Sequence, residues 1–326
     1  MIEGTNEPKR ISLNDYLSHW TQDGHRLVHG PSGTTWLRYE SFSMMQFPTF
    51  FQSPVRRADL LHALWRGPAL AVTHLLEPDA SHPANACLYV CRDKSYRVEN
   101  LTSVGRRDAR RANRSLRLAF VDWPTIFSQG FTAYSETRRR IGLSDGTREH
   151  FRRRFTLFST NPGHVAVGAW KDLTLVAFMT LVIVEDWVEI TGTFSTDAHR
   201  GLCPNDGLAS FVLKHFLADR GFRKVSYGLS SIQEGEVENS LHNFKKKVGF
   251  EAKPVHRVFV VHPLLRPLDN GIGAHGIRML RRLFPGSRHI RKASGLIEFL
   301  SARGKSRQQV EWPAHSLVRQ ATQLWK

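Results

Sequence analysis

The chain contains few cysteines and no long apolar run. Its three cysteines cannot all pair, and no second Cys/His group lies beside them at zinc-ligand spacing. We interpret Cys87, Cys91 and Cys203 as reduced packing residues and expect no metal site. The lack of an apolar run of about 18 residues, together with a mean hydropathy of -0.34, argues against a membrane-spanning helix.

The start of the chain has no feature of a secretory signal. Residues 1–14 are polar, with no apolar stretch behind their few charges. We therefore expect a flexible leader and a cytoplasmic protein, with peripheral attachment to a membrane left open.

Acidic residues are scarce relative to basic ones. The sequence has 46 Lys and Arg against 29 Asp and Glu, a formal net charge of +17. Such a charge attracts nucleic acid, an anionic membrane surface or a phosphate-bearing small molecule. Charge alone does not choose among these partners, and solubility or a generally basic proteome is the plain alternative.

The composition allows a substantial folded core. The 326 residues are 41% hydrophobic and 10% aromatic, which suits one large domain or two tightly joined smaller ones. A short helix is predicted over residues 16–27. Three stretches that follow are rich in β-branched and aromatic residues and predict strands: residues 34–45, 69–76 and 86–91.

An arginine-rich helix is predicted over residues 103–116. Arg106, Arg110, Arg114 and Arg117 are spaced so that they share one helix face. That face suits phosphate or a tRNA backbone, because guanidinium groups make bidentate contacts with phosphate. A solvated helix face is the alternative. The next predicted elements are a strand over residues 118–121 and helices over residues 123–141 and 147–159.

The clearest pattern in the chain is a three-stranded meander. Residues 164–170, 173–184 and 187–194 predict three strands joined by tight breaks, and the middle run ends in two acids. This run is too short to span a membrane and fits a strand buried on both faces. The order then continues with a helix, a strand, a helix and a last strand, over residues 207–220, 224–229, 240–248 and 255–262.

This order of elements resembles the GNAT acyltransferase fold. Residues 240–250 read Ser-Leu-His-Asn-Phe-Lys-Lys-Lys-Val-Gly-Phe, which is similar to the closing motif of that family. Phe244-Lys245, followed by Gly249-Phe250, resembles the Phe-Lys…Gly pattern of Fem-like transferases. Those enzymes add amino acids from aminoacyl-tRNA to peptidoglycan precursors or related acceptors. The resemblance covers roughly residues 85–262.

The resemblance implies an α/β (α+β) fold and a division of the chain. We expect a GNAT-like mixed sheet, mostly antiparallel and flanked by helices, with a degenerate second GNAT-like half. The expected parts are a flexible leader, an N-terminal GNAT-like half, an acyltransferase core, a basic amphipathic extension and a flexible tail, over residues 1–14, 15–120, 121–268, 269–304 and 305–326. The extension interleaves basic and apolar residues over residues 276–302, which suits either an acidic surface or packing on the parent domain.

The resemblance also implies a reaction. The chain is expected to move an acyl or aminoacyl group from acyl-CoA, acyl carrier protein or aminoacyl-tRNA to an amine, with no tightly bound cofactor. The basic patches would then contact tRNA or an anionic membrane surface. A different hypothesis is a noncatalytic GNAT-like module that binds nucleic acid or an anionic membrane.

A loop before the predicted helix at residues 207–220 is the candidate donor site. It reads Arg200-Gly-Leu-Cys-Pro-Asn-Asp-Gly-Leu-Ala209, and its glycines depart from the spacing with which GNAT enzymes grip coenzyme A. Free N–H groups at a helix start still suit a phosphate. We therefore name Arg200, Asn205 and Gly207 as donor- or phosphate-binding candidates, with capping by Asn205 or Asp206 as the alternative.

Transfer to an amine needs a base and oxyanion stabilisation. Glu189, in the third meander strand, is the first candidate base, and a solvent-facing position is its alternative. His199 and His242 are further base candidates. The resemblance makes Lys245 the candidate for holding an oxyanion or a phosphate. Tyr227 and Ser230 are expected to line the same cleft, and Asn243 either binds the donor or caps a helix.

Overall fold

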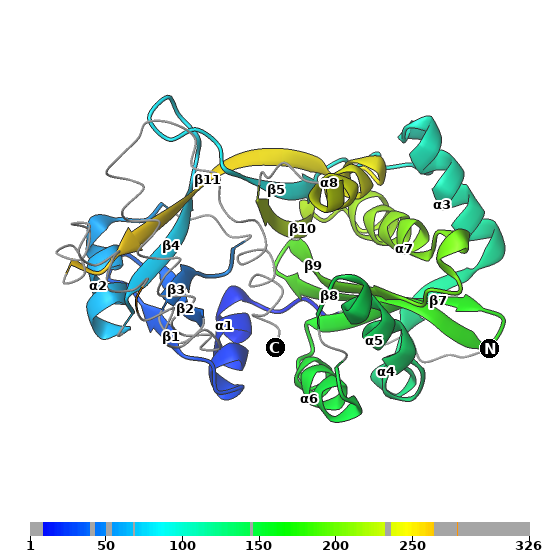
Figure 1. Ribbon diagram of the computed structural model, residues 1–326, viewed down its shortest axis with the longest axis horizontal. Coiled ribbons are helices and arrows are strands. Elements are labelled where there is room, and N and C mark those ends of the chain that lie inside the picture. Colours follow the sequence, from blue (N-terminus) through cyan, green and yellow to red (C-terminus); the bar gives the residue numbers. More distant parts are fainter. Residues whose placement is uncertain are drawn as a thin grey trace.

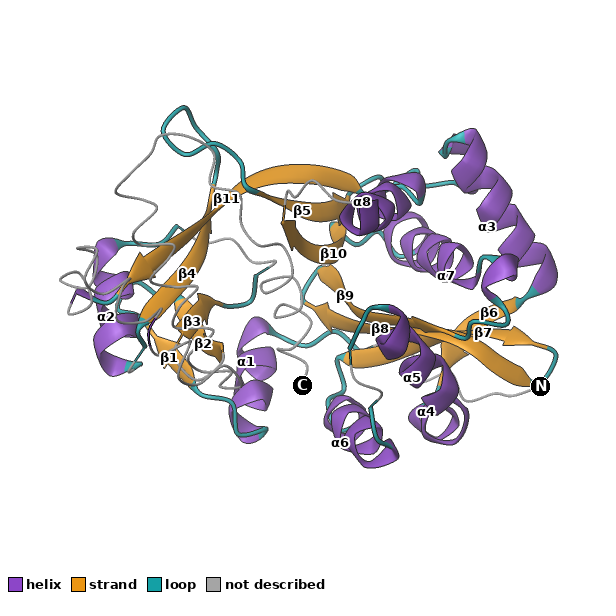
Figure 2. Ribbon diagram, in the orientation of Figure 1, coloured by secondary structure: helices purple, strands orange, loops and turns teal. Residues whose placement is uncertain are grey.

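The computed structural model describes residues 9–39, 43–49, 54–67, 69–143, 146–231, 236–263 and 279. The described strands form one sheet of eleven strands in the order β1-β2-β3-β4-β11-β5-β10-β9-β8-β7-β6. Most neighbouring strands run antiparallel, while β3–β4 and β9–β10 run parallel. Helices cover the sheet on both sides (Figures 1 and 2). The predicted fold, a mostly antiparallel mixed sheet flanked by helices, is confirmed.

The bounds of the elements are as follows. The strands are β1 (Leu27–His29), β2 (Thr35–Tyr39), β3 (Ser43–Gln46), β4 (Ala71–Leu76), β5 (Ala86–Cys91), β6 (Arg117–Val121), β7 (His164–Lys171), β8 (Thr174–Val184), β9 (Trp187–Ser195), β10 (Lys224–Ser231) and β11 (Glu251–Val261). The helices are α1 (Leu13–Gln22), α2 (Arg57–Arg66), α3 (Ser103–Ser115), α4 (Trp123–Gln129), α5 (Phe131–Arg140), α6 (Arg148–Ser159), α7 (Pro204–Leu213) and α8 (Glu236–Lys247). A π-helical segment, Lys214–Asp219, extends α7.

The same order of elements occurs twice along the chain. In the first half, the meander β1-β2-β3 is followed by α2 and by β4, which runs parallel to β3. In the second half, β7-β8-β9 is followed by α7 and by β10, which runs parallel to β9. The division of the chain into two GNAT-like halves stays a prediction, to which this repeat lends support.

The two halves exchange strands at the centre of the sheet. β5 follows β4 along the chain but pairs with β10. β11 follows β10 and α8 but pairs with β5 through its first part and with β4 through its second part. The strands between residues 164 and 262 are therefore not all neighbours of one another, because β5 lies between β10 and β11.

The middle meander strand, β8, lies at the centre of the core. All of its residues after Thr174 are buried. Met179 and Leu181 belong to the apolar cluster that contains the core side of α7, whereas Phe178 belongs to the cluster that contains α5 and α6 residues. Successive side chains of a strand point to opposite faces, so burial on both faces requires the continuous apolar run that the sequence shows.

Several local predictions differ from the structure. Residues 34–45 form parts of two strands, β2 and β3, and the predicted helix over residues 123–141 is two helices, α4 and α5. The break falls at Gly130, where an added Cβ would lie 3.1 Å from the Phe178 ring. The strand β1 and the helix α2 were not predicted.

The structure describes residues 9–14 of the expected leader. Ile11, in the expected leader, is buried, and Glu185 N–H donates to its carbonyl oxygen at 2.8 Å. The expected extension and tail lie outside the described residues, apart from Met279. Among the helices that the structure describes, none is long and apolar enough to cross a membrane.

Candidate functional site

β9 and β10 diverge after a short parallel contact. Their register runs through three pairs and ends at Ser226 and Glu189. Beyond this point β10 follows β5, with an irregularity between Ser226 and Leu229. Gly228, inside that irregularity, has a φ of 74°, which a residue without a Cβ adopts readily. The strand that follows α7 therefore diverges from the meander after Ser226.

Lys245 of α8 is buried beside this divergence. Its side chain is only 3% exposed, and its Nζ donates a hydrogen bond to Ser230 Oγ at 2.8 Å. The Nζ lies 4.4 Å from the centroid of the Tyr89 ring and 5.0 Å from that of Tyr227. Burial lowers the pKa of Lys245 to about 7. The structure thus brings together the predicted residues Lys245, Ser230 and Tyr227.

The two neighbouring lysines have different surroundings. Lys246 is exposed. Lys247 Nζ lies 2.9 Å from Asp108 Oδ2 and 2.5 Å from Asp206 Oδ1. Consecutive residues on a helix point about 100° apart, so this tripeptide supplies one buried amine, one solvated amine and one amine within ion pairs.

Tyr89 is a site residue that sequence reasoning missed. It comes from β5, which belongs to the first half of the chain, and its hydroxyl bonds to Nδ1 of His242 on α8. The Tyr227 hydroxyl bonds to Thr193 Oγ1 of β9 at 2.7 Å, so the two hydroxyls connect β9 to β10. The only sequence signal for Tyr89 is its place in an apolar strand, and that signal does not show which half of the sheet the strand joins.

Glu189 lies on the other face of the sheet. Its neighbours Val188 and Ile190 belong to the cluster beneath α7, whereas Trp187 packs in the cluster that contains α1. Strand alternation therefore directs Glu189 to the α1 side. The negative charge of Glu189 raises the pKa of Tyr16 in α1, which is consistent with this placement. Glu189 does not make a hydrogen bond with Lys245.

Burial shifts the pKa values of Glu189 and of the neighbouring Lys224. Glu189 is partly buried, and burial raises its pKa to about 8, with the nearby ammonium of Lys224 acting in the opposite direction. Lys224 is itself buried, with its Nζ 2.8 Å from the centroid of the Trp187 ring, and its pKa falls to about 7. Glu189 is therefore protonated for much of the time at neutral pH.

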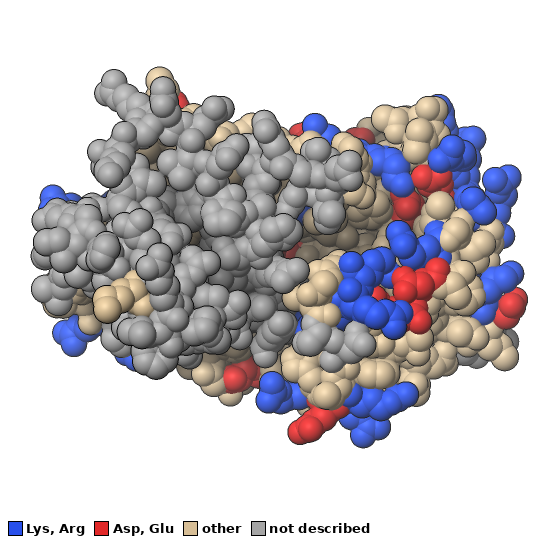
Figure 3. Space-filling view, in the orientation of Figure 1, with Lys and Arg blue, Asp and Glu red and all other residues tan. Residues whose placement is uncertain are grey.

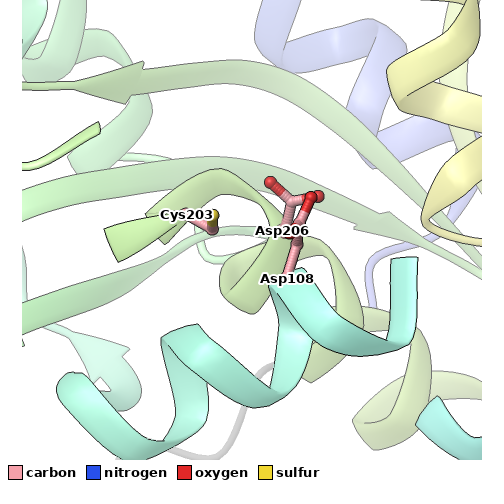
Figure 4. A group of neighbouring side chains, drawn as sticks. All are labelled: Asp108, Cys203 and Asp206. Carbon is pink, nitrogen blue, oxygen red and sulfur yellow. The ribbon is translucent and has the colours of Figure 1, made fainter. Parts of the chain in front are cut away.

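The start of α7 carries acidic side chains instead of an open phosphate site. Asp206 in its first turn and Asp108 of α3 are both buried, and their carboxylates lie close together near Cys203 (Figure 4). These three residues bring one ligand atom each within 4.8 Å of one another, but the Lys247 ammonium already contacts both carboxylates. Carboxylates at this position disfavour an added phosphate by repulsion.

The predicted donor-binding residues do not converge. Arg200 is exposed in the turn before α7, and Asn243 is exposed on α8. Asn205 is partly buried, and its buried Oδ1 has no hydrogen-bond partner. A Cβ on Gly207 would lie 2.6 Å from the Cβ of Ala112, so Gly207 permits the close contact of α7 with α3.

The predicted polyanion-binding arginines lie on α3. Arg106 and Arg110 both bond to Glu99, at 3.1 Å to its carbonyl oxygen and 3.4 Å to its Oε1. Arg114 is exposed, as is Arg111 beside it. Basic side chains gather at the edge of the molecule where α3 lies, on the right in Figure 3. His199, a fallback base, bonds to Thr196 Oγ1 at 3.0 Å and lies at a turn outside this site.

Comparisons with known proteins identify the fold. No protein-family model matches the chain, and no curated protein matches its sequence. Among solved structures, FemX is 10% identical with a TM-score of 0.57, over 78% of this chain and 93% of FemX. L-PGS from Bacillus licheniformis is 12% identical with a TM-score of 0.47, over 77% of this chain and 91% of that chain. A tandem GNAT protein from the clavulanic acid biosynthesis pathway is 12% identical with a TM-score of 0.45, over 79% of this chain and 90% of that chain. The fold is GNAT/Fem-like, as the sequence resemblance predicted.

Proposed function

We propose that this protein transfers an acyl or aminoacyl group from an activated donor to an amine, at the divergence of β9 and β10. The observation that carries the proposal is the buried amine of Lys245, held by Ser230 between two tyrosine rings beside the diverging strands. The fold shared with FemX supports the same class of reaction. Because fold does not determine function, the proposal depends on the site.

The reaction needs few groups from the protein. The amine attacks the donor carbonyl, a C–N bond forms, and the carbonyl oxygen becomes an oxyanion. The bond from carbon to the donor oxygen or sulfur then breaks, and the amine loses a proton to a base. Holding the two reactants together contributes several kcal/mol, and a positioned cation contributes a few more. Lys245, when protonated, is the cation that we assign to the oxyanion.

The two faces of the sheet suit two substrates. Lys245 and Tyr227 lie on the α7 and α8 face, and Glu189 lies on the α1 face. The donor carbonyl would approach from the first face and the amine from the second, and the two would meet where the strands separate. Glu189 would then accept the amine proton, a role for which a pKa near the working pH is suitable.

The acidic start of α7 bears on the choice of donor. Asp108 and Asp206 stand where a GNAT enzyme would bind the pyrophosphate of coenzyme A, and Lys247 balances only part of their charge. We therefore favour a donor whose phosphates bind elsewhere over acyl-CoA bound at this loop. Arg111 and Arg114 of α3 are exposed cations that suit the backbone of a tRNA donor.

The test begins with the donor and then compares two lysines. Mass spectrometry of small molecules and RNA that copurify with the protein identifies the donor class. We expect Lys245→Ala to lower kcat/KM at least about tenfold, which corresponds to roughly 1.4 kcal/mol of transition-state binding. Lys246→Ala, on the same helix but exposed, should stay within about twofold of the wild type. Full activity in Lys245→Ala, or an equal loss in both variants, would refute the assignment.

The exposed arginines support one second candidate, a noncatalytic module that binds a polyanion. It predicts RNA or anionic-vesicle binding that weakens steeply with salt, with no transfer product from any donor and no effect of Lys245→Ala. The same two variants therefore separate the enzyme from the binding module.

A further inference from the structure

A cavity of about 100 Å³ lies between α1 and α6, away from Lys245. Both helices lie in the lower part of the view in Figure 1. Liquid water occupies about 30 Å³ per molecule, so the cavity has room for a small polar group. The lining residues that matter below are His19, Asp23, Arg153, Arg154 and His164.

His164, the first residue of β7, is the unusual member of this lining. It is only 5% exposed, and both of its ring nitrogens are buried without a hydrogen-bond partner. The Phe158 ring packs edge-on against it at 4.4 Å between centroids. A neutral imidazole carries one N–H donor and one acceptor, and buried polar groups of native proteins almost always have partners. The unpaired nitrogens therefore point to a group that the cavity receives.

The charges around the cavity favour an anion. Asp23 Oδ2 lies 3.3 Å from Nε2 of His19, so the one carboxylate among the lining residues already has a partner. Two guanidinium groups, Arg153 and Arg154, come from consecutive positions of α6. Arg153 is exposed at the mouth, whereas burial lowers the pKa of Arg154 to about 10, which leaves it charged at neutral pH.

The other titratable groups facing the cavity do not change this balance. His150 bonds through Nδ1 to the Tyr134 hydroxyl at 2.9 Å. His25 packs on Trp20 with 4.6 Å between ring centroids, and burial lowers its pKa. A metal ion is disfavoured, because the His and Asp residues here do not bring three ligand atoms within 4.8 Å of one another.

We propose that this cavity binds the carboxylate or phosphate group of a small molecule. His164 donates a hydrogen bond to the anion from one ring nitrogen, and Arg153 supplies charge at the mouth, where a guanidinium group pairs with two oxygens at once. The site is distinct from the Lys245 site, and its occupancy is measured without any acyl donor. Failure of this proposal therefore leaves the proposed transfer untouched.

The test measures the melting temperature of the whole protein against inorganic phosphate and, separately, acetate. Sodium chloride keeps the ionic strength constant. We expect one or both anions to raise the wild-type melting temperature in a saturable manner, and the more effective anion identifies the group bound. Arg153→Gln should need at least fivefold more anion for the same rise. Arg152→Gln, one residue away on α6 and absent from the lining, is the matched control and should respond like the wild type.

A second variant addresses the buried ring directly. His164→Phe keeps a planar ring of similar size and removes both unpaired nitrogens, so it should fold and lose the anion response. Equal responses in the wild type, Arg153→Gln and Arg152→Gln would overturn the proposal, because they would indicate general screening of a basic protein. Stabilisation by zinc chloride but by neither anion would overturn it as well.

Discussion

At the scale of single residues, three consecutive lysines have the same side chain in three different environments. Lys245 is buried against two tyrosine rings, Lys246 is solvated, and Lys247 joins α8 to Asp108 and Asp206. The resemblance to Fem-like transferases singled out Lys245 from the sequence. The sequence could not show that Lys247 is held in ion pairs, because its partners lie far away along the chain.

The ionisation of Glu189 gives a prediction about pH and stability. Its pKa is about 8 in the folded protein, against an ordinary value of 4.5, so the folded state binds this proton more tightly than the unfolded state does. Stability from this group is therefore present below about pH 4.5 and is lost as the pH rises through about 8. Glu189→Gln has the same shape and cannot ionise, so it should be more stable than the wild type at pH 9.

Calorimetric melting temperatures at pH 5 and pH 9 test this prediction. The difference between Glu189→Gln and the wild type should grow in favour of the variant as the pH rises. Transfer activity should fall in the variant at pH 9, where the wild-type Glu189 carboxylate is ionised and accepts the amine proton. It should differ little at pH 5, where Glu189 is protonated in the wild type as well. A stability difference that does not change with pH would show that Glu189 is solvated, which is the alternative that the sequence left open.

At the scale of elements, the contact of α3 with α7 decides the role of Gly207. The sequence made this glycine a donor-binding candidate, and the structure places it against Ala112. We expect Gly207→Ala to lower the free energy of unfolding by about 1–3 kcal/mol, because the added methyl group overpacks the helix contact. Urea unfolding measures the change.

A second glycine, in the turn before α7, is the control for this prediction. Gly201 has open space around its Cβ position, so Gly201→Ala should stay within about 0.5 kcal/mol of the wild type. If Gly207→Ala were as stable as the wild type but bound donor weakly, the original donor-binding hypothesis would return.

Elements with a continuous apolar pattern were predictable, and a helix with few buried residues was not. β8 was evident from one apolar run, and β5 was predicted with its observed bounds. By contrast, α2 buries only Asp59, Ala63 and Leu64. Asp59 accepts a hydrogen bond from the N–H of Ser32 at 2.9 Å, so a distant loop helps to fix the start of this helix. A periodicity argument does not detect a helix with so few buried residues.

At the scale of the whole molecule, the exchange of β5 and β11 makes the halves interdependent. β10 depends on β5 for its antiparallel partner, and β4 depends on β11. We expect a fragment of residues 102–262 not to fold, because removal of β5 leaves β10 and the first part of β11 with unpaired edges. Circular dichroism and proton NMR of the fragment test this expectation.

Limited proteolysis of the whole chain provides an independent check on the same prediction. It should release no stable fragment that starts near residue 125, and thermal unfolding should show one transition. Two separate transitions, or a folded fragment of residues 102–262, would show that the second half is an independent domain.

The sequence by itself determined the periodic elements, the GNAT-like order after residue 164 and the candidacy of Lys245, because all of these depend on residues close together along the chain. Tertiary structure alone decided that β5 joins the far half of the sheet, that Tyr89 meets Lys245, and that Glu189 faces α1. It also decided that Asp108 of α3 lies beside Asp206, which makes the start of α7 acidic. The physical reason is that these contacts join residues about a hundred or more positions apart along the chain. The local sequence pattern around a residue does not show which distant surface its side chain will contact.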